Sequence, residues 1–301
     1  MGKNKFSVLL ILIAGILWGC IGLFVRTINS WGISSMEIVE LRAFVTAISM
    51  LVVLLVYDRK MLRIKLKDFW CFIGTGILSI LFFNFCYFKA IGLASMSVAA
   101  VLLYTAPAIV MVLSFFLFKE KFNKRKIISL VMTFVGCVFV TGFVGSDKPL
   151  SLGSVLVGLG AGLGYALYSI FSRYALERGY STFTITFYTF LIASVGALFI
   201  SDTKLVITTV SVSPLRVLIA VAFGIVSTVL PYICYTLGLK NVENGKASII
   251  ASIEPVTATI LGIIIFSEPV TFTGILGVVL VIVALAICNV SPKNSEGKGE
   301  V

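Results

Sequence analysis

Long apolar stretches dominate this sequence of 301 residues and constrain its fold more than any other feature. Each of ten stretches has about 18 or more residues, enough to cross the ~30 Å hydrocarbon core of a bilayer as a helix. They lie at residues 7–27, 36–57, 69–90, 96–118, 127–144, 152–173, 183–201, 214–237, 246–266 and 272–290. Charged residues make up only 12% of the chain, whereas about 25% is usual in soluble proteins. The sequence therefore predicts an all-α integral membrane protein with ten transmembrane helices.

The chain contains the same unit twice. Equivalent residues, 147 or 148 positions apart, include Pro107 and Pro255, Glu120 and Glu268, Arg26 and Arg173, and Trp18 and Tyr165. Because each unit has five stretches, an odd number, the second unit must enter the membrane from the opposite face. Inverted repeats of this kind are frequent in secondary transporters, which place the substrate site between the halves. We expect two five-helix repeats, 1–145 and 150–290, followed by a disordered cytoplasmic tail, 291–301.

Lysines and arginines between the apolar stretches predict the orientation. Two basic loops, 57–67 and 119–126, fall on the same side of the predicted helices as both termini. Basic loops are retained in the cytoplasm, so we expect a multi-pass protein with both termini cytoplasmic. The net charge of +11 does not indicate nucleic acid binding, because the charges are distributed between the stretches. Residues 202–214 are then expected to form a short extracellular loop.

The residue inventory argues against catalysis and metal binding. Histidine is absent, and the six cysteines lie within apolar stretches without forming a C-x-x-C pair. We interpret them as buried thiols rather than disulfides or metal ligands. Alternate glycines in the sixth stretch lack the preceding strand of a dinucleotide-binding loop, and these are Gly158, Gly160, Gly162 and Gly164. We therefore expect no catalytic residue, no metal site and no cofactor.

Two ionisable residues inside the apolar stretches are the strongest candidates for a substrate pathway. A charged side chain at membrane depth costs at least ~2.5 kcal/mol on insertion scales, so Glu254 and Arg42 are functional candidates by default. Glu254 is expected to contact a cationic group of the substrate or to exchange a proton. The alternative is that it only accepts hydrogen bonds from a neighbouring helix. Arg42 is predicted to lie roughly 9 Å from Glu254 in height, which argues against a permanent ion pair between them.

Proline and aromatic residues extend this candidate site. Pro107 and Pro255 each remove a helical hydrogen bond, and the freed carbonyls are tolerated at membrane depth where they line a cavity. Kinks that only serve packing are the alternative. Aromatic and amide side chains would supply an amphipathic cavity wall, although tyrosines are also ordinary residues of the membrane interface. These candidates are Trp18, Asn84, Tyr87, Tyr104, Tyr165, Tyr168, Tyr232 and Tyr235.

Four other charged residues have simpler interpretations. Glu40 and Lys89 are ionisable candidates of second rank for the substrate pathway. Glu40 lies near the outer boundary of its stretch, where we expect it to be solvated. Lys89 is expected to extend its ammonium group to the membrane surface. Glu120 and Glu268, at the ends of two stretches, are expected to be structural residues of helix ends.

These residues together resemble the EamA-type transporters of the drug/metabolite transporter superfamily. The resemblance covers nearly the whole chain and rests on Trp18-Gly19 with Arg26, on Arg42, on Pro107 with Glu120, and on Glu254-Pro255 with Glu268 and Gly277. It implies a carrier of the bacterial cytoplasmic (inner) membrane, often an exporter of amino acids or other small metabolites. The expected partners are a small-molecule substrate and membrane lipid. A homodimer is a further possibility. One departure is that Arg42 has Thr189 as its repeat partner, so the halves differ chemically there.

Two other function classes compete with a transporter that works by alternating access. An integral-membrane enzyme acting on lipid would need a nucleophile, a metal or an acid/base cluster at one interface. A non-transporting sensor or scaffold would be favoured by a large soluble domain or long loops. The sequence has neither feature, so a secondary transporter is the leading hypothesis.

Overall fold

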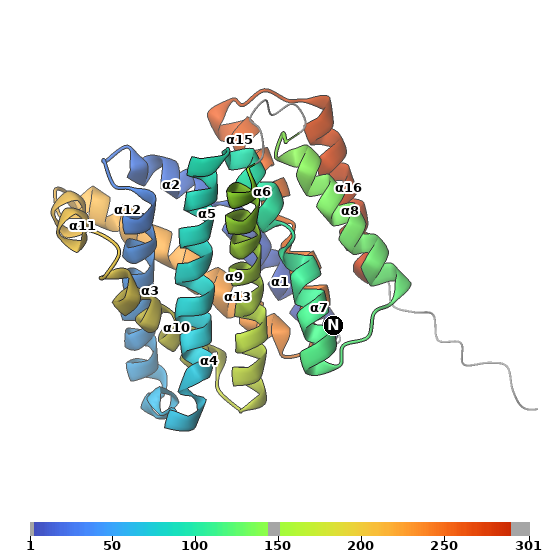
Figure 1. The fold of residues 1–301 in the computed structure, drawn as a ribbon. Coiled ribbons are helices and arrows are strands. Elements are labelled where there is room, and N and C mark those ends of the chain that lie inside the picture. Colours follow the sequence, from blue (N-terminus) through green and yellow to red (C-terminus); the bar gives the residue numbers. More distant parts are fainter. Residues whose placement is uncertain (1–2, 144–150, 290–301) are drawn as a thin grey trace, which may run out of the picture.

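The computed structural model describes residues 3–143 and 151–289, in which no β-strand occurs (Figure 1). The helices of the first half are α1 (Lys3–Gly19), α2 (Ile21–Asn29), α3 (Ser35–Tyr57), η1 (Arg59–Leu62), η2 (Leu66–Asp68), α4 (Phe69–Ile73), η3 (Gly74–Leu81), α5 (Phe82–Leu93), α6 (Met96–Leu103), α7 (Ala106–Phe118) and α8 (Lys124–Val140). Those of the second half are α9 (Leu152–Glu177), α10 (Thr182–Ala197), α11 (Thr203–Val210), α12 (Pro214–Gly224), η4 (Ile225–Val229), α13 (Leu230–Leu239), α14 (Asn244–Ala251), α15 (Glu254–Phe266) and α16 (Phe272–Asn289). The all-helical prediction is confirmed.

Eight continuous or nearly continuous helical segments are long and apolar enough to cross a membrane. They are Asn4–Asn29, Ser35–Tyr57, Leu66–Leu93, Met96–Phe118, Leu152–Glu177, Pro214–Leu239, Asn244–Phe266 and Phe272–Asn289. Two further helices correspond to predicted spans but are shorter, with 17 residues in α8 and 16 in α10. The chain is a multi-pass membrane protein.

The segment 202–214 was predicted as a loop, and this prediction was wrong. It contains α11, whose first turn is capped by Asp202, because a carboxylate oxygen accepts a hydrogen bond from the Leu205 amide at 3.0 Å. Val206 anchors this helix in a buried cluster with Ile38 and Phe223. The local sequence shows only a partial alternation of polar and apolar residues. Burial of Val206 against the neighbouring helices therefore stabilises this helix. The tail predicted at 291–301 lies outside the described residues.

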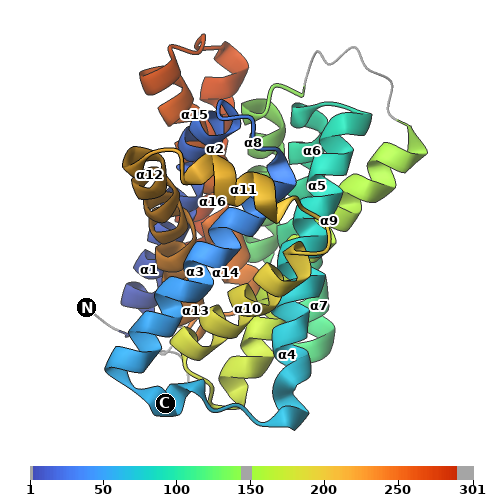
Figure 2. The same cartoon turned by 90° about the vertical axis from the view of Figure 1, so that its left-hand side faces the viewer.

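The α6–α7 pair and the α14–α15 pair are built alike. Their helix bounds lie 148 residues apart, and in each pair the helix breaks shortly before proline, Pro107 in α7 and Pro255 in α15. Both pairs end with a residue in the left-handed conformation, Lys119 with φ 56° and Ser267 with φ 54°. The two pairs run in opposite directions through the molecule, since α6 lies above α7 while α14 lies below α15 (Figure 2).

Glycines allow α1 and α9 to pack directly against these breaks. A Cβ atom at Gly15 of α1 would lie 2.7 Å from the carbonyl oxygen of Ala251, the last residue of α14. A Cβ atom at Gly162 of α9 would lie 3.0 Å from the carbonyl oxygen of Leu102 in α6. Only residues without a side chain permit such approaches, so each glycine fixes a helix of one half against a broken helix of the other half.

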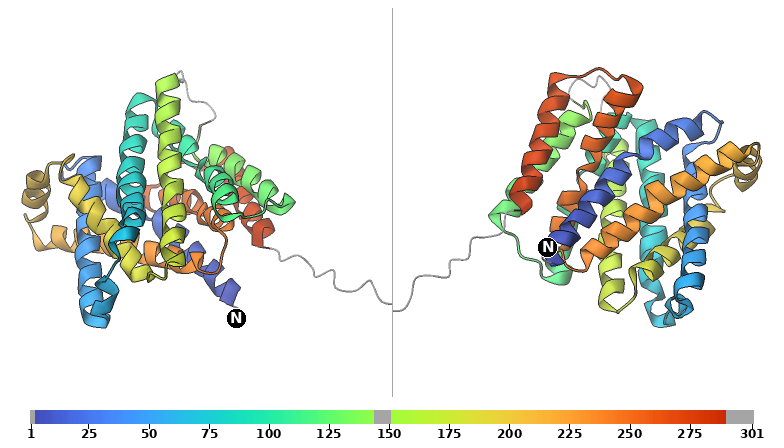
Figure 3. Two further views of the ribbon diagram at one scale, coloured as in Figure 1. Left: turned by 60° about the horizontal axis from the view of Figure 1, so that its bottom comes forward. Right: turned by 180° about the vertical axis from the view of Figure 1, so that it is seen from behind.

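The remaining helices complete the bundle around this centre. α3 packs against α10, α5 against α9, and α1 against α13. α8 and α16 lie side by side at the periphery (Figure 3). Two π-helical segments, η3 and η4, interrupt the α-helices that lead into α5 and α13. π-helical turns are rare in proteins, and those that occur are often found near functional sites.

Candidate functional site

A small pocket lies where α1, α5, α9, α13 and η3 meet. Its lining residues are Trp18, Ser79, Ile80, Phe83, Tyr165, Tyr168, Ser169, Tyr232 and Tyr235. Its volume is about 20 Å³. A cavity needs roughly 10–15 Å³ on this measure to hold one water molecule. The pocket in this conformation is therefore occluded to any organic metabolite.

Aromatic rings form most of the pocket wall. The Trp18 ring lies 5.2 Å from the ring of Tyr232, 5.3 Å from that of Tyr235 and 6.2 Å from that of Tyr165, measured between centroids. Tyr168 meets Tyr232 edge-to-face at 4.8 Å. An aromatic ring has a partly negative face and a partly positive edge, and both surround this small volume. Aromatic faces attract cations.

Two hydroxyl pairs fix the orientation of the tyrosines. The Tyr168 hydroxyl lies 2.8 Å from the Thr236 hydroxyl, and the Tyr235 hydroxyl lies 2.7 Å from that of Ser169. Both pairs join α9 to α13 and are buried. These bonds satisfy polar groups that would otherwise be costly to bury and hold the rings in place.

Glu254 is the first residue of α15 and directly follows the break after α14. It is partly buried, and one carboxylate oxygen accepts a hydrogen bond from the Tyr165 hydroxyl at 3.2 Å. A carboxylate at a helix N-terminus is also favoured by the helix dipole. The hydrogen bond to Tyr165 therefore connects Glu254 to the aromatic wall of the pocket.

Arg42 on α3 is buried and bonds to Asn84 on α5. Its guanidinium Nη2 donates to Asn84 Oδ1 at 3.2 Å, and the Asn84 amide group donates to the carbonyl oxygen of Ile80 at 2.7 Å. The Nε of Arg42 is buried without a hydrogen-bond partner in the described part of the chain. An unpartnered donor on a buried cation is costly, and a ligand or water that accepts its hydrogen bond would relieve that cost.

The predicted site residues are distributed unevenly. Trp18, Tyr165, Tyr168, Tyr232 and Tyr235 line the pocket together, whereas the other candidates are not among its lining residues. Asn84 contacts Arg42, Tyr87 packs on Phe83, and Tyr104 packs against the core. Within the described residues Arg42 and Glu254 form no ion pair.

The prediction that Glu40 is solvated was wrong. The residue is 4% exposed, and its carboxylate accepts hydrogen bonds from the hydroxyls of Ser201 at 2.7 Å and Thr203 at 2.6 Å. Ser201 lies in the link between α10 and α11, and Thr203 begins α11. Both are far away in sequence, so the position of Glu40 within its stretch could not reveal them. Lys89 is exposed, and its ammonium group lies 5.7 Å from the centroid of the Phe85 ring.

Four pocket residues were missed by the sequence interpretation. Ser79 and Ile80 belong to the π-helical segment η3, and Phe83 and Ser169 lie on α5 and α9. A π-helical turn shifts the face that a residue presents, so a regular helical period misassigns it. The candidates were chosen for charge or for Trp, Tyr or Asn side chains within apolar stretches, and none of these four residues is of those types.

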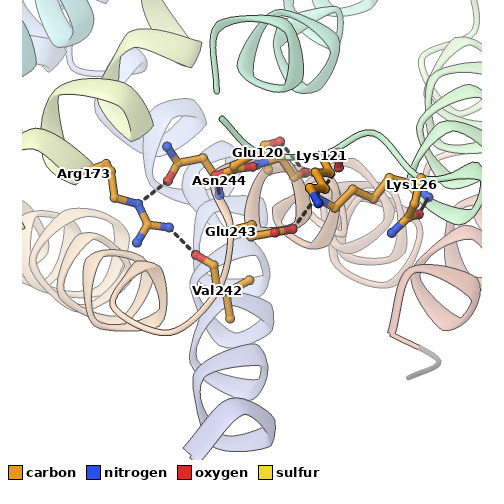
Figure 4. A network of polar contacts seen from close by, with 10 residues as sticks. Glu120, Lys121, Lys126, Arg173, Val242, Glu243 and Asn244 are labelled. Atoms are coloured by element: carbon orange, nitrogen blue, oxygen red, sulfur yellow. Dashed lines mark hydrogen bonds and ion pairs between the residues drawn. The ribbon is translucent and has the colours of Figure 1, made fainter. Parts of the chain in front are cut away.

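A second polar cluster lies at the end of the molecule where α7 ends and α14 begins (Figure 4). Glu120 accepts hydrogen bonds from the backbone amides of Asn244 at 2.7 Å and Gly245 at 3.1 Å. Arg173 donates to the side-chain oxygen of Asn244 at 3.1 Å and to the carbonyl of Val242 at 2.6 Å. Nearby, Lys126 and Glu243 form an ion pair. The cluster joins the two halves of the chain.

No group of three or more Cys, Asp or Glu side chains forms a metal-binding cluster among residues 3–143 and 151–289. The six cysteines are free.

Comparisons with known proteins give consistent results. The model of the EamA-like transporter family matches residues 5–142 and again residues 152–290. An uncharacterized transporter of Archaeoglobus fulgidus is 29% identical over 215 residues, which cover 70% of this chain and 75% of the relative. The uncharacterized transporter YyaM of Bacillus subtilis is 25% identical over 247 residues and 80% of each chain. A protein of solved crystal structure shares the fold, with a TM-score of 0.77 at 18% identity, over 94% of this chain and 96% of its own.

Proposed function

Because this chain belongs to the EamA-like transporter family, which each of its halves matches, we propose that it is a secondary transporter that exports amino acids or related small metabolites. Family membership makes it a membrane transporter, as its relatives are named. To that we add a substrate class, a direction and a mechanism.

The proposed architecture is ten transmembrane helices in two inverted five-helix repeats, with the domain boundaries 1–145 and 150–290. The helix bounds of α6–α7 and α14–α15, which lie 148 residues apart, and the opposite directions of the two pairs support it (Figure 2). The shorter helices α8 and α10 complete the ten. Basic loops at one side support a cytoplasmic location of both termini in a bacterial inner membrane.

One observation supports this substrate class, namely that a carboxylate is hydrogen-bonded to a tyrosine of the aromatic pocket wall. Glu254 is bonded to Tyr165, whose ring packs on Trp18 in the pocket wall. A protonated amine is attracted both by a carboxylate and by aromatic faces. Arg42 supplies the opposite charge and holds an unused Nε–H donor. A zwitterionic amino acid has the two groups that these side chains would recognise.

Alternating access explains how such a substrate would reach an occluded pocket. The volume of about 20 Å³ excludes an amino acid, so the helices must separate before a substrate binds. Rocking of the two halves around the pocket would open it to one face at a time.

Transport by purified protein in proteoliposomes tests this function. Vesicles loaded with one unlabelled amino acid are diluted into a trace of the same labelled compound, and counterflow is followed for a panel of amino acids, amines and sugars. We expect accumulation of labelled amino acids that is strongly reduced in Glu254→Gln. Equal counterflow of sugars and amino acids, or none for any amine, would contradict the substrate class.

A further inference from the structure

The carboxylate of Glu120 closes one end of the molecule by capping a helix of the opposite half. Both carboxylate oxygens are used, one by the amide of Asn244 and the other by the amide of Gly245 (Figure 4). These are the first two residues of α14, whose N–H groups have no intrahelical partner. The negative charge is also favourable at the positive end of the helix dipole. We call this end of the molecule the Glu120 end.

The equivalent glutamate at the other end has a different partner. Glu268 lies 148 positions after Glu120 and follows the same left-handed turn, and in both cases the glutamate amide donates at 3.2 Å to the carbonyl six residues earlier. Its carboxylate, however, forms an ion pair with Arg26. In the described structure it does not bond to the amides of Met96 and Ser97, which are the equivalents of Asn244 and Gly245.

Helix packing shows the same difference between the two ends. At the Glu120 end, α7 packs against α14. At the other end, which we call the Glu268 end, the equivalent helices α15 and α6 are not among the extensively packed helix pairs in the part of the chain that the structure describes. The molecule is therefore fastened at the Glu120 end and unfastened at the Glu268 end.

We propose that Glu120 and Glu268 form an exchanging lock, in which one of them caps a helix whenever the other is released. In the present conformation Glu120 caps α14 and Glu268 is held by Arg26. In the opposite conformation, obtained when the two inverted halves exchange their arrangements, Glu268 caps α6 at Met96 and Ser97 and Glu120 leaves α14. This lock rests on the proposed function, because it assigns the contacts that alternate during transport.

The chemistry of the two arginines supports this assignment. Arg173 is part-buried and is bound by the side chain of Asn244 and the carbonyl of Val242, so it belongs to the fastened end. Arg26 is more exposed, with 54% of its side chain accessible. Met96, the equivalent of Asn244, has no amide to hold Arg26. Arg26 is thus left to bind Glu268 and keep it from α6, with its guanidinium 4.0 Å from the Phe266 ring centroid.

The exchanging lock and a static lock at each end predict different responses to substitution. If Arg26 and Glu268 only fastened the Glu268 end, Arg26→Gln and Glu268→Gln would both open that end. In an exchanging lock, Arg26→Gln frees Glu268 to cap α6, which closes the Glu268 end and opens the Glu120 end. Glu268→Gln removes the cap of the opposite conformation. It therefore closes the Glu120 end and opens the Glu268 end.

Cysteine accessibility measures these responses without any substrate. Ser169→Cys places a reporter in the pocket wall of a protein whose six native cysteines have been replaced. A small membrane-impermeant thiol reagent is added to right-side-out and to inside-out vesicles. We expect Arg26→Gln and Glu120→Gln to raise labelling from the same face, the one at the Glu120 end, by about tenfold, as loss of one hydrogen bond to a charged group would do. Glu268→Gln should raise labelling from the opposite face.

Glu177→Gln is the matched control, since Glu177 is an exposed carboxylate at the end of α9, and it should leave both rates unchanged. Labelling from opposite faces in Arg26→Gln and Glu120→Gln would overturn the exchanging lock, as would unchanged rates in both. That comparison decides the matter even if Glu268→Gln fails to assemble. A transporter of another substrate class would still show the accessibility changes, so failure of the lock and failure of the proposed function are distinguishable.

Discussion

The hydroxyl of Tyr165 lies 3.2 Å from a carboxylate oxygen of Glu254 and donates a hydrogen bond to it. Tyr165 lies in the middle of α9, and Glu254 is the first residue after the break between α14 and α15. The bond connects the acidic group of the candidate site to a ring that also packs on Trp18. The Glu254 carboxylate is therefore linked by one hydrogen bond to the pocket wall.

We predict that Glu254→Gln lowers amino acid counterflow by about 10- to 100-fold, because a hydrogen bond to a charged group contributes about 1.5–3 kcal/mol. Tyr165→Phe removes only the hydroxyl and should reduce counterflow several-fold. Counterflow in proteoliposomes with matched protein content is the measurement. Glu177→Gln should be unaffected, and an unchanged rate and pH dependence in Glu254→Gln would leave Glu254 without a role in transport.

The buried Arg42–Asn84 bond should contribute to stability as a coupled pair. Arg42→Gln, Asn84→Leu and the double variant form a cycle, and we expect a coupling free energy of about 0.5–2 kcal/mol from thermal unfolding in detergent. Phe85 lies next to Asn84 but is 50% exposed, so Arg42→Gln with Phe85→Leu should be additive. Additivity of the first pair would show that the hydrogen bond carries no net energy.

Alanine substitutions at two glycines of the first span should have opposite effects. A Cβ atom at Gly15 would lie 2.5 Å from the Ile253 side chain and 2.7 Å from the Ala251 carbonyl, so Gly15→Ala should destabilise by about 1–3 kcal/mol. A Cβ atom at Gly22 would meet nothing within 4 Å, so Gly22→Ala should stabilise α2 by about 0.5–1 kcal/mol. Thermal unfolding of both variants measures this. Equal shifts would refute the close packing of α1 on the break.

The predicted orientation is tested by single cysteines in a cysteine-free background. Arg63→Cys lies in a basic loop and should be labelled by an impermeant thiol reagent only after the cells are permeabilised. Ser211→Cys, in the link between α11 and α12, should be labelled in intact cells. Both positions are exposed, so access and not burial determines the result. Labelling of Arg63→Cys from outside would reverse the topology.

Within the site, the sequence identified groups that are chemically conspicuous and missed those placed by packing. Glu254 and Arg42 could be named because charge inside an apolar stretch is unusual, and five aromatic residues because such side chains can form an amphipathic cavity wall. Ser79 and Ile80 could not, since a π-helical turn in η3 brings them into the wall. Glu40 was misjudged because its partners Ser201 and Thr203 lie more than 160 residues away.

The sequence by itself determined the membrane-spanning helical character of the chain, the equivalence of Pro107 with Pro255 and the residues able to carry charge. These follow from local properties, since hydropathy, proline geometry and ionisation depend on the residue and its neighbours in the chain. Only the tertiary structure decided that Glu120 caps α14 while its equivalent Glu268 binds Arg26. The two glutamates have the same side chain and follow the same left-handed turn, so which partner each meets depends on how the two halves are packed at that end of the molecule.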